Sequence, residues 1–375
     1  YLVYGKGLGS LKIKKNKILN CGNSGTLARL LIGIMSTNPK IKVKLKGDQS
    51  LNKRSMKKLI NLMSEFGATF HPVNKFNFPM EIVSSEMPIG INYKSRVSAQ
   101  LKSAVIFAGL NSYGVTNILE EKKSRNPTEN MLLQNSKVIK IKQDSKKRNL
   151  IKINGKQFLK PLKLNIPSDP SSAAFFTALT LLGKNNFLII KNVGLNPRRI
   201  GYYKLLKKFG ANIKFKNIKK INNEEVGDIF VKSSKIKPLK ASSDYYVSST
   251  DEYPILFVIA ALTSGVSNFK GIEDLANKES NRIKEMQNIL KQIGIKSKSK
   301  KDQLTIYGSD KLKNKSLIKI PNLGDHRICM STVILSLVTG IKSEIKNFET
   351  VYSSSPSFLK IIKLLGGKFE IKKKS

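Results

Sequence analysis

The sequence contains no tryptophan, and its 375 residues include only two cysteines, Cys21 and Cys329. Two cysteines cannot build a disulfide framework, which excludes the small disulfide-stapled secreted domains and fits a reducing cytoplasm. The longest apolar run, Pro254 to Leu262, is far shorter than the roughly 18 residues of a membrane span. The opening YLVYGKGLGS lacks the basic, apolar and small-residue order of a signal peptide. We therefore predict a cytoplasmic protein that crosses no membrane.

Acidic residues are scarce. The chain has 25 Asp and Glu against 68 Lys and Arg, a formal net charge of +43. Nucleic-acid-binding proteins tend to concentrate charge on one face and to interleave it with aromatic residues, whereas here aromatics are 7% and the lysines are spread along the chain. The lysines are therefore interpreted as a solvated surface, with no specific nucleic-acid partner. The rival class, a basic nucleic-acid-binding protein, predicts steeply salt-dependent binding to DNA.

Arginine is the informative basic residue, because only nine of the 68 basic residues are arginine. Its planar fork recognises carboxylate and phosphate in a bidentate way that lysine cannot reproduce. Five arginines fall at expected loop-to-helix junctions, namely Arg29, Arg54, Arg125, Arg282 and Arg327. Their positions indicate sites for anionic ligands.

A repeat runs through the chain. Five segments have the composition of helices that are apolar nearly all round, starting at Asn23, Ser98, Asp169, Asp251 and Asp325, at intervals of 75, 71, 82 and 74 residues. A helix without a polar face lies in an interior. A β-rich stretch follows each one, and after four of these comes an amphipathic helix that ends at glycine and leads into another strand. The pattern predicts an α/β protein made of five such units.

The glycines that end the second helices, Gly67, Gly210, Gly294 and Gly366, are predicted to be C-terminal caps. The segment 1–22 is interpreted as the closing strands of an earlier unit, with YGKGLGS as a hairpin turn. On this interpretation the chain begins in the middle of a repeat.

Two domains are expected, because 375 residues exceed one ordinary core. The stretch from Lys137 to Gln157 is predicted to be a long hairpin, and PLKLNIPSDPSS from Pro161 a crossing between domains. The boundary is placed near Pro167. Residues 1–167 then form a first domain, incomplete at its N-terminus, and residues 168–375 a second domain of three units.

Three motifs lie in the first domain. GNSGT supplies backbone amides that suit an oxyanion, but simple N-capping by Ser24 and Thr26 explains it equally well. In GDQSLNKR, the alternative to a ligand site is a surface loop with Arg54 in solvent. In VSAQLKS, Ser98 and Gln100 could bind a ligand or form a capping pair.

The second domain has three further motifs. Asp251 and Glu252 open a buried helix, and N-capping explains only one of the two carboxylates. NKESNRI is interpreted as placing Lys278 and Arg282 on one helix face, four residues apart, with a solvated ion-pair cluster as the alternative. DHRI precedes another buried helix, and there Arg327 is favoured over the histidine. The two cysteines are expected to be core residues.

Taken in order, several motifs together resemble the EPSP synthase (3-phosphoshikimate 1-carboxyvinyltransferase) family from Asn20 to the C-terminus. They are GNSGTLARLL, GDQSLNKRSM, SAQLKSAVIFAGL, SRNPTENM, SDPSSAAFF, DEYPILFVIAAL, NKESNRI and DHRICMS. The resemblance implies a two-domain inside-out α/β barrel of βαβαββ units, of which five of six would be present. It implies a monomer that transfers the enolpyruvyl group of phosphoenolpyruvate to shikimate 3-phosphate, without metal or cofactor.

The resemblance also assigns site residues. Those for phosphoenolpyruvate are Gly25, Arg54, Gln100, Arg282 and Arg327. Those for shikimate 3-phosphate are Ser98, Ala99, Gln100, Arg125, Asp251 and Lys278. The catalytic groups are Asp251, Glu279 and Lys278.

The family's early motif, with a Lys, a Ser and an Arg that grip both substrates, has no match here. The chain is therefore expected to be either a fragment of a complete enzyme or unable to turn over. Two further hypotheses are a relative that binds ligand without catalysis and the related UDP-N-acetylglucosamine enolpyruvyl transferase. The latter uses a loop cysteine, whereas Cys21 and Cys329 flank predicted buried helices.

Overall fold

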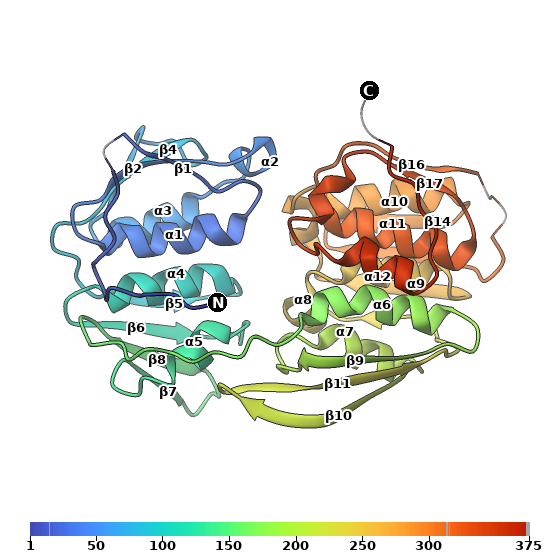
Figure 1. The fold of residues 1–375 in the computed structure, drawn as a ribbon, viewed down its shortest axis with the longest axis horizontal. Coiled ribbons are helices and arrows are strands. Elements are labelled where there is room, and N and C mark those ends of the chain that lie inside the picture. The colour runs from blue at the N-terminus through green and yellow to red at the C-terminus, as the bar shows by residue number, and fades with distance from the viewer. Residues whose placement is uncertain (15, 313, 315, 373–375) are drawn as a thin grey trace. The chain divides into compact units, whose positions relative to one another are not determined.

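The computed structural model describes residues 1–14, 16–312, 314 and 316–372, which fold into alternating helices and strands (Figure 1). The chain divides into two compact units. Unit 1 is Tyr1–Asn165 with Ile221–Glu224, and unit 2 is Ile166–Lys220 with Glu225–Ser375. Each has its own hydrophobic core. Within the described residues, every helix is too short or too polar to cross a bilayer.

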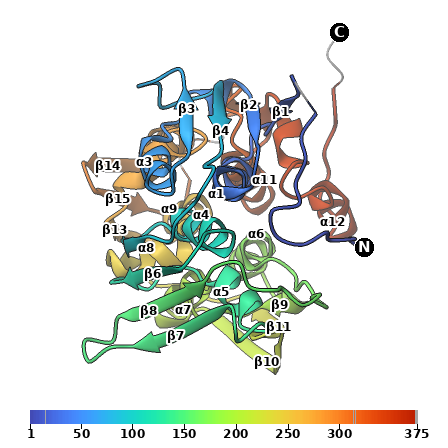
Figure 2. The same ribbon diagram turned by 90° about the vertical axis from the view of Figure 1, so that its left-hand side faces the viewer.

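Unit 1 has two four-stranded sheets with helices between them (Figures 1 and 2). The first half runs β1 (Ile18–Asn20), α1 (Gly25–Thr37), β2 (Lys42–Lys46), α2 (Gln49–Asn52), α3 (Lys57–Glu65), β3 (Thr69–His71) and β4 (Met80–Val83). The second runs β5 (Asn92–Ser95), α4 (Ala99–Leu110), β6 (Val115–Glu120), α5 (Pro127–Leu132), β7 (Ile139–Gln143) and β8 (Asn149–Asn154). The strand orders, β1-β2-β4-β3 and β5-β6-β8-β7, are equivalent. The predicted hairpin over 137–157 is confirmed by the antiparallel pairing of β7 with β8.

Each half of unit 1 opens on a strand that runs parallel to the strand after the buried helix. Strand β1 therefore belongs with α1 and does not close an earlier unit, so the interpretation of residues 1–22 is wrong. Residues 1–14 contain no strand, and the hairpin expected at YGKGLGS is not formed there. The alternation of apolar and basic residues over Leu11–Lys14 mimics a strand, but none of the strands in the described part of the chain pairs with it.

Unit 2 repeats this path less completely. Its first two repeats comprise α6 (Pro170–Leu182), β9 (Phe187–Gly194), α7 (Gly201–Lys208), β10 (Asn212–Ile221), β11 (Glu224–Lys232), β12 (Lys240–Ala241), α8 (Asp244–Ser249), α9 (Tyr253–Ala261), β13 (Gly265–Lys270), the 3-10 helix η1 (Glu273–Asn277), α10 (Arg282–Gln292), β14 (Lys296–Lys300) and β15 (Gln303–Gly308). A third comprises β16 (Ile318–Ile320), α11 (His326–Thr339), β17 (Ser343–Ile345), η2 (Phe348–Val351) and α12 (Phe358–Leu364). Among the described residues the three sheets of unit 2 have the orders β10-β11-β9, β12-β13-β15-β14 and β16-β17, and the middle one is equivalent to the sheets of unit 1. The predicted α/β class of repeated βαβαββ units is confirmed.

The last repeat is shorter than predicted. No strand follows Gly366 in the described residues up to Lys372, so the strand expected after LLGG is wrong for that stretch. Residues 373–375, placed in the second domain by the sequence, lie outside the described residues.

The five helices predicted to be buried are α1, α4, α6, α9 and α11, and all nine residues of α9 are buried. The four predicted capping glycines have positive φ values of 78° to 98°, which a residue with a Cβ adopts only with strain. Helices α1 and α4 pack closely at Gly33, where a Cβ would lie 2.6 Å from the carbonyl oxygen of Ala104. Glycine there lets the two helices lie side by side (Figures 1 and 2), and a hydrogen bond between Gln100 and Thr26 brings their first turns together.

The turn between β10 and β11 belongs to unit 1 although the strands around it belong to unit 2. Asn222 Oδ1 accepts a hydrogen bond from Asn165 N at 2.9 Å, and its Nδ2 donates to Lys163 O at 2.8 Å. Asn223 Nδ2 donates to Asn130 O at 3.2 Å. Unit 1 is therefore assembled from two separate stretches of the chain.

Candidate active site

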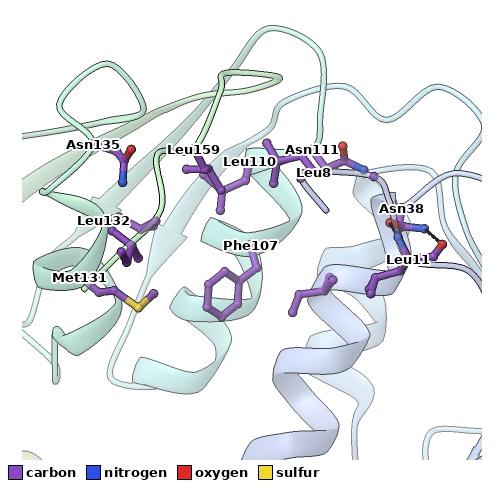
Figure 3. A pocket seen from close by; sticks show the side chains of 14 residues that line it. Leu8, Leu11, Asn38, Phe107, Leu110, Asn111, Met131, Leu132, Asn135 and Leu159 are labelled. Atoms are coloured by element: carbon purple, nitrogen blue, oxygen red, sulfur yellow. Dashed lines mark hydrogen bonds between the residues drawn. The ribbon is translucent and has the colours of Figure 1, made fainter. Parts of the chain in front are cut away.

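A cavity of about 240 Å³ in unit 1 is lined by no charged side chain (Figure 3). It lies at the C-terminal ends of α1 and α4, next to their capping residues Asn38 and Asn111. Helix C-termini carry partial negative charge, and the apolar wall formed by Phe107, Leu110 and Met131 offers no hydrogen bond. The cavity therefore offers an anion no counter-charge, and its polar lining consists of the amides of Asn38, Asn111 and Asn135.

The opposite end of these helices has the required chemistry. Ser24 caps α1, its Oγ accepting a hydrogen bond from Leu27 N at 3.1 Å. A Cβ on Gly25 would lie 3.0 Å from Nη1 of Arg29 and 3.2 Å from Nη1 of Arg54. Two guanidinium groups therefore lie against the first turn of α1, where backbone N–H groups favour negative charge. Capping and anion binding are compatible interpretations of GNSGT.

Side chains join the first turns of α1 and α4. Gln100 Nε2 donates to Thr26 Oγ1 at 2.7 Å, and Arg29 Nη1 donates to Gln100 Oε1 at 2.7 Å. Ser98 caps α4, its Oγ accepting from Leu101 N at 3.3 Å. Ser98 thus serves as a cap, while Gln100 bonds to the other helix, so the two do not form a capping pair.

The loop with Arg54 is fixed by Asp48. The carboxylate of Asp48 accepts from Leu51 N at 2.8 Å and from Asn23 Nδ2 at 2.5 Å, which ties this loop to GNSGT. Arg54 is half-buried, so it does not lie free in solvent, although the loop itself is at the surface with Asp48, Gln49 and Lys53 exposed. Arg125 is also half-buried, in the loop between β6 and α5, and Ala99 is the first residue of α4.

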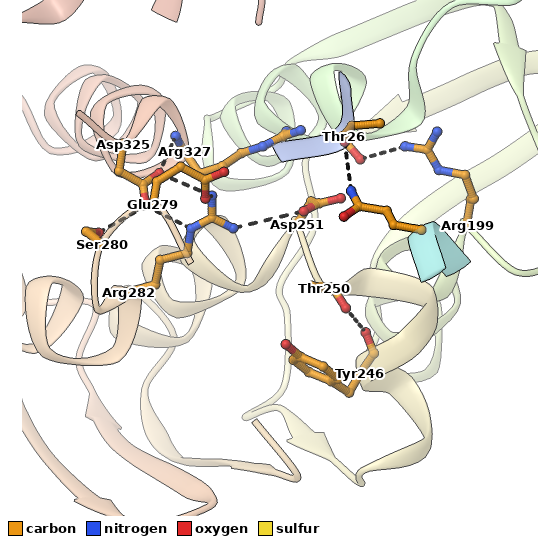
Figure 4. Close-up of polar contacts among 12 residues, drawn as sticks. Thr26, Arg199, Tyr246, Thr250, Asp251, Glu279, Ser280, Arg282, Asp325 and Arg327 are labelled. Atoms are coloured by element: carbon orange, nitrogen blue, oxygen red, sulfur yellow. Dashed lines mark hydrogen bonds and ion pairs between the residues drawn. The ribbon is translucent and has the colours of Figure 1, made fainter. Parts of the chain in front are cut away.

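In unit 2, Arg282 is the centre of an ionic cluster (Figure 4). It is 1% exposed, and its Nε and Nη2 donate to the two oxygens of Asp325 at 2.9 and 3.2 Å. Nη2 also donates to Glu279 Oε2 at 2.5 Å, and Nη1 lies 4.0 Å from Asp251 Oδ1. The guanidinium lowers the pKa of Asp325 despite its burial, and the carboxylates raise the pKa of Arg282. The solvated-cluster alternative is therefore wrong.

Lys278 and Arg282 do not share a helix face, which corrects the interpretation of NKESNRI. Helix α10 begins at Arg282, because the Asn281 side chain caps it by accepting from Lys284 N at 3.1 Å. Lys278 stands before this cap, directly after η1, in extended conformation. Burial lowers the pKa of Lys278, while Asp251 opposes that shift.

The two carboxylates before α9 are arranged differently from the prediction. The helix begins at Tyr253, Glu252 is its N-cap residue, and the Glu252 side chain makes no capping hydrogen bond. N-capping therefore does not account for Glu252. Asp251 lies one residue earlier with 27% of its side chain exposed. Asp251 is thus the more accessible of the two carboxylates.

Helix α11 carries the last predicted arginine. Asp325 caps it by accepting from Arg327 N at 3.0 Å, and Arg327 lies over the ring of Phe175 at 5.9 Å. Arg327 Nη1 is buried and has no hydrogen-bond partner among the described residues. Burial and then Arg327 lower the pKa of His326 to about 4, so this imidazole is neutral near pH 7.

Sequence reasoning missed an ion pair at the start of α6. Arg199 Nη2 donates to Asp169 Oδ1 at 2.8 Å and to Ser171 Oγ at 3.1 Å. Arg199, followed by Arg327, lowers the pKa of Asp169 against the effect of its burial. Because Arg198 and Arg199 are neighbours in the sequence, the sequence alone does not indicate which of the two side chains contacts the start of α6.

Both cysteines are buried and free, as predicted for core residues. Burial raises the pKa of Cys21 and raises that of Cys329 to about 12, so neither thiol is activated. Among the described residues, no group of three or more His, Cys, Asp or Glu side chains could hold a metal ion.

Comparison with known proteins gives consistent results. The family profile of EPSP synthase (3-phosphoshikimate 1-carboxyvinyltransferase) matches residues 2–362. The chain is 37% identical to the 3-phosphoshikimate 1-carboxyvinyltransferase of Zymomonas mobilis, covering 98% of this chain and 82% of that protein. It is 39% identical to the one from Thermodesulfovibrio yellowstonii over 97% and 83%. The solved EPSP synthase of Acinetobacter baumannii matches with a TM-score of 0.77 and 32% identity over 96% and 81%.

Proposed function

This chain belongs to the EPSP synthase family, and on that premise we propose how its residues carry out the family's reaction. The protein is a transferase that moves the carboxyvinyl group of phosphoenolpyruvate to the 5-hydroxyl of shikimate 3-phosphate and releases phosphate. The reaction belongs to the shikimate pathway, which leads to chorismate and the aromatic amino acids.

The observation that carries the assignment of the site is the arginine chemistry in unit 2. Arg282 and Arg327 are nearly completely buried, and Nη1 of Arg327 has no hydrogen-bond partner among the described residues. Nη1 of Arg282 makes no hydrogen bond there either, and its ion-pair partner Asp251 Oδ1 lies 4.0 Å away. A guanidinium nitrogen that keeps hydrogen-bonding capacity in a desolvated position supports binding of a carboxylate or phosphate, the two groups that both substrates carry.

The division of residues follows the motifs. Phosphoenolpyruvate would be bound by Gly25, Arg54, Gln100, Arg282 and Arg327. Shikimate 3-phosphate would be bound by Ser98, Ala99, Gln100, Arg125, Asp251 and Lys278. Each residue is supported by its place at a helix start or in a loop next to one, where backbone and side-chain donors are available.

Two proton transfers accompany the addition step. Asp251 accepts the proton of the 5-hydroxyl while the hydroxyl oxygen forms a bond to C2 of phosphoenolpyruvate. Glu279, with Lys278 beside it in the sequence, donates the proton that C3 gains. Loss of phosphate and of a C3 proton then restores the double bond. Arg54, Arg282 and Arg327 stabilise the charge of the tetrahedral intermediate. The support for Asp251 is its exposure next to a guanidinium, which keeps a carboxylate available as a base.

The related UDP-N-acetylglucosamine enolpyruvyl transferase reaction is less well supported. Its loop cysteine has no counterpart here, because Cys329 lies inside α11 and Cys21 is buried. We also propose that the enzyme works in the cytoplasm as a monomer, since all the assigned residues come from one chain. Its mass in solution tests the monomer.

The direct test is phosphate release by the purified full-length protein in the presence of both substrates. We expect release only when both are present, and loss of release in Asp251→Asn. Release that depends on UDP-N-acetylglucosamine in place of shikimate 3-phosphate would favour the alternative. Binding of both substrates without any release would indicate a relative that does not catalyse the reaction.

A further inference from the structure

A buried ionic cluster in unit 1 has no part in the mechanism above. Lys102 Nζ lies 2.5 Å from Glu120 Oε1 and 2.6 Å from Glu129 Oε1, and none of the three side chains is more than 2% exposed. Glu129 keeps one oxygen without a hydrogen-bond partner among the described residues. Because the desolvation of buried charges offsets much of their attraction, such a cluster is weak evidence for stability and better evidence for a fixed geometry.

The cluster joins three elements. Lys102 lies on α4, Glu120 is the last residue of β6, and Glu129 lies in the first turn of α5. A second contact runs beside it, since the hydroxyls of Ser103 and Thr128 are 2.8 Å apart. The ammonium of Lys102 therefore fixes both ends of the β6–α5 loop to the same turn of α4.

Glu120 also holds the loop from inside. Its Oε1 accepts hydrogen bonds from the backbone N and the Oγ of Ser124, at 2.9 and 2.8 Å. Its Oε2 accepts from Asn149 Nδ2 at 2.6 Å, which anchors the carboxylate to β8. Ser124 directly precedes Arg125, so these hydrogen bonds fix the position of the backbone from which the Arg125 side chain extends.

Lys102 is also connected to the first turn of α4. The backbone N of Lys102 donates to Ser98 O at 3.1 Å, which places Lys102 one turn beyond the Ser98 cap. One residue thus connects the first turn of α4, with Ser98 and Gln100, to the loop with Arg125.

We propose that Lys102, Glu120 and Glu129 are positioning residues, which hold Arg125 in register with the first turn of α4 so that both grip the same ligand. This inference rests on the proposed role of Arg125 and Ser98 in binding shikimate 3-phosphate. It assigns the cluster to affinity for that substrate and not to phosphoenolpyruvate or to the chemical step.

The principal variant is Glu129→Gln, which keeps the shape and an acceptor for Lys102 but removes one charge. We expect about a three- to tenfold weaker binding of shikimate 3-phosphate by calorimetry, with kcat and the KM for phosphoenolpyruvate within twofold of wild type. Lys102→Met should have a larger effect in the same direction, with circular dichroism to check folding. The matched control is Lys94→Met, since Lys94 pairs with Glu121 at 3.0 Å but is 66% exposed. This control should bind as wild type.

A double-mutant cycle with Arg125→Ala decides whether the cluster acts through Arg125. We expect Glu129→Gln to weaken binding in the wild-type background and to add little once Arg125 is absent. An equal effect in both backgrounds, or none in either, overturns the positioning role while leaving the proposed function intact. If Arg125→Ala alone leaves the affinity unchanged, the assignment of Arg125 fails first, and the inference fails with it.

Discussion

Replacing Arg282 with lysine keeps the positive charge in the unit 2 cluster but removes the planar guanidinium group. The guanidinium makes two hydrogen bonds to Asp325 and one to Glu279. A lysine ammonium has no planar fork and can replace one of these three in the same direction, so two charge-assisted bonds are lost. At about 1.5–3 kcal/mol each, the loss is about 3–6 kcal/mol, divided between folding and substrate binding.

We expect Arg282→Lys to lower kcat/KM for phosphoenolpyruvate by about tenfold or more and to lower the free energy of unfolding in urea. The control is Arg148→Lys. Arg148 pairs with Asp144 at 2.6 Å at the turn of the β7–β8 hairpin, where 33% and 16% of the two side chains are exposed. A partly exposed pair contributes less than a buried cluster, so both quantities should change less than in Arg282→Lys. A destabilised Arg282→Lys variant with near-normal kinetics would make the cluster purely structural. Unchanged stability would contradict the hydrogen-bond reasoning itself.

Three further predictions concern single residues. Asp251→Asn should leave shikimate 3-phosphate affinity within a few fold but reduce kcat by about 10²-fold or more, because a carboxamide cannot accept the proton; stopped-flow or steady-state assays measure this. Burial lowers the pKa of His326 to about 4, below the ordinary value near 6.5 that it has in the unfolded chain. The free energy of unfolding therefore contains a contribution from neutral His326 that is fully present above pH 6.5 and is lost as the pH falls through 4. Unfolding in urea at stepped pH should therefore show a loss of about 3 kcal/mol that is reduced in His326→Gln. Gly25→Ala should raise the KM for phosphoenolpyruvate more than that for shikimate 3-phosphate, since the new Cβ displaces the tips of Arg29 and Arg54; equal KM changes would contradict this.

The interior of this protein was predictable because its helices are apolar all round. The run around Leu256 has no polar face to present to water, so burial was the one available arrangement, and α9 is completely buried. The glycine caps were equally clear, since Gly67 and Gly294 follow amphipathic helices and precede strands. Both signals depend only on residues close together in the sequence, and for that reason they were enough to predict the α/β class and the buried helices.

Helix boundaries and pairings were not fixed by local signals. The three-residue strand at Ile18–Asn20 becomes a strand only because β2, after the intervening helix, offers it a parallel partner. Lys278 and Arg282 have helical spacing, but the Asn281 cap separates them. Lys102 is one of many lysines, and only the tertiary packing brings two carboxylates to it. The pairing of β1 and the ion pairs of Lys102 thus depend on partners far away in the sequence, which no local pattern reveals.

The two stretches that make up unit 1 also set an order of events during synthesis. Asn165 and Lys163 bond to Asn222, which leaves the ribosome only after α6, β9, α7 and β10 of unit 2. At 5–20 residues per second, the interval is roughly 3 to 12 seconds. During that time the backbone N–H of Asn165 and the carbonyl of Lys163 lack their partner, because Asn222 has not yet been synthesised. The last contacts of unit 1 are therefore made while unit 2 is being synthesised, and the two units cannot mature strictly one after the other.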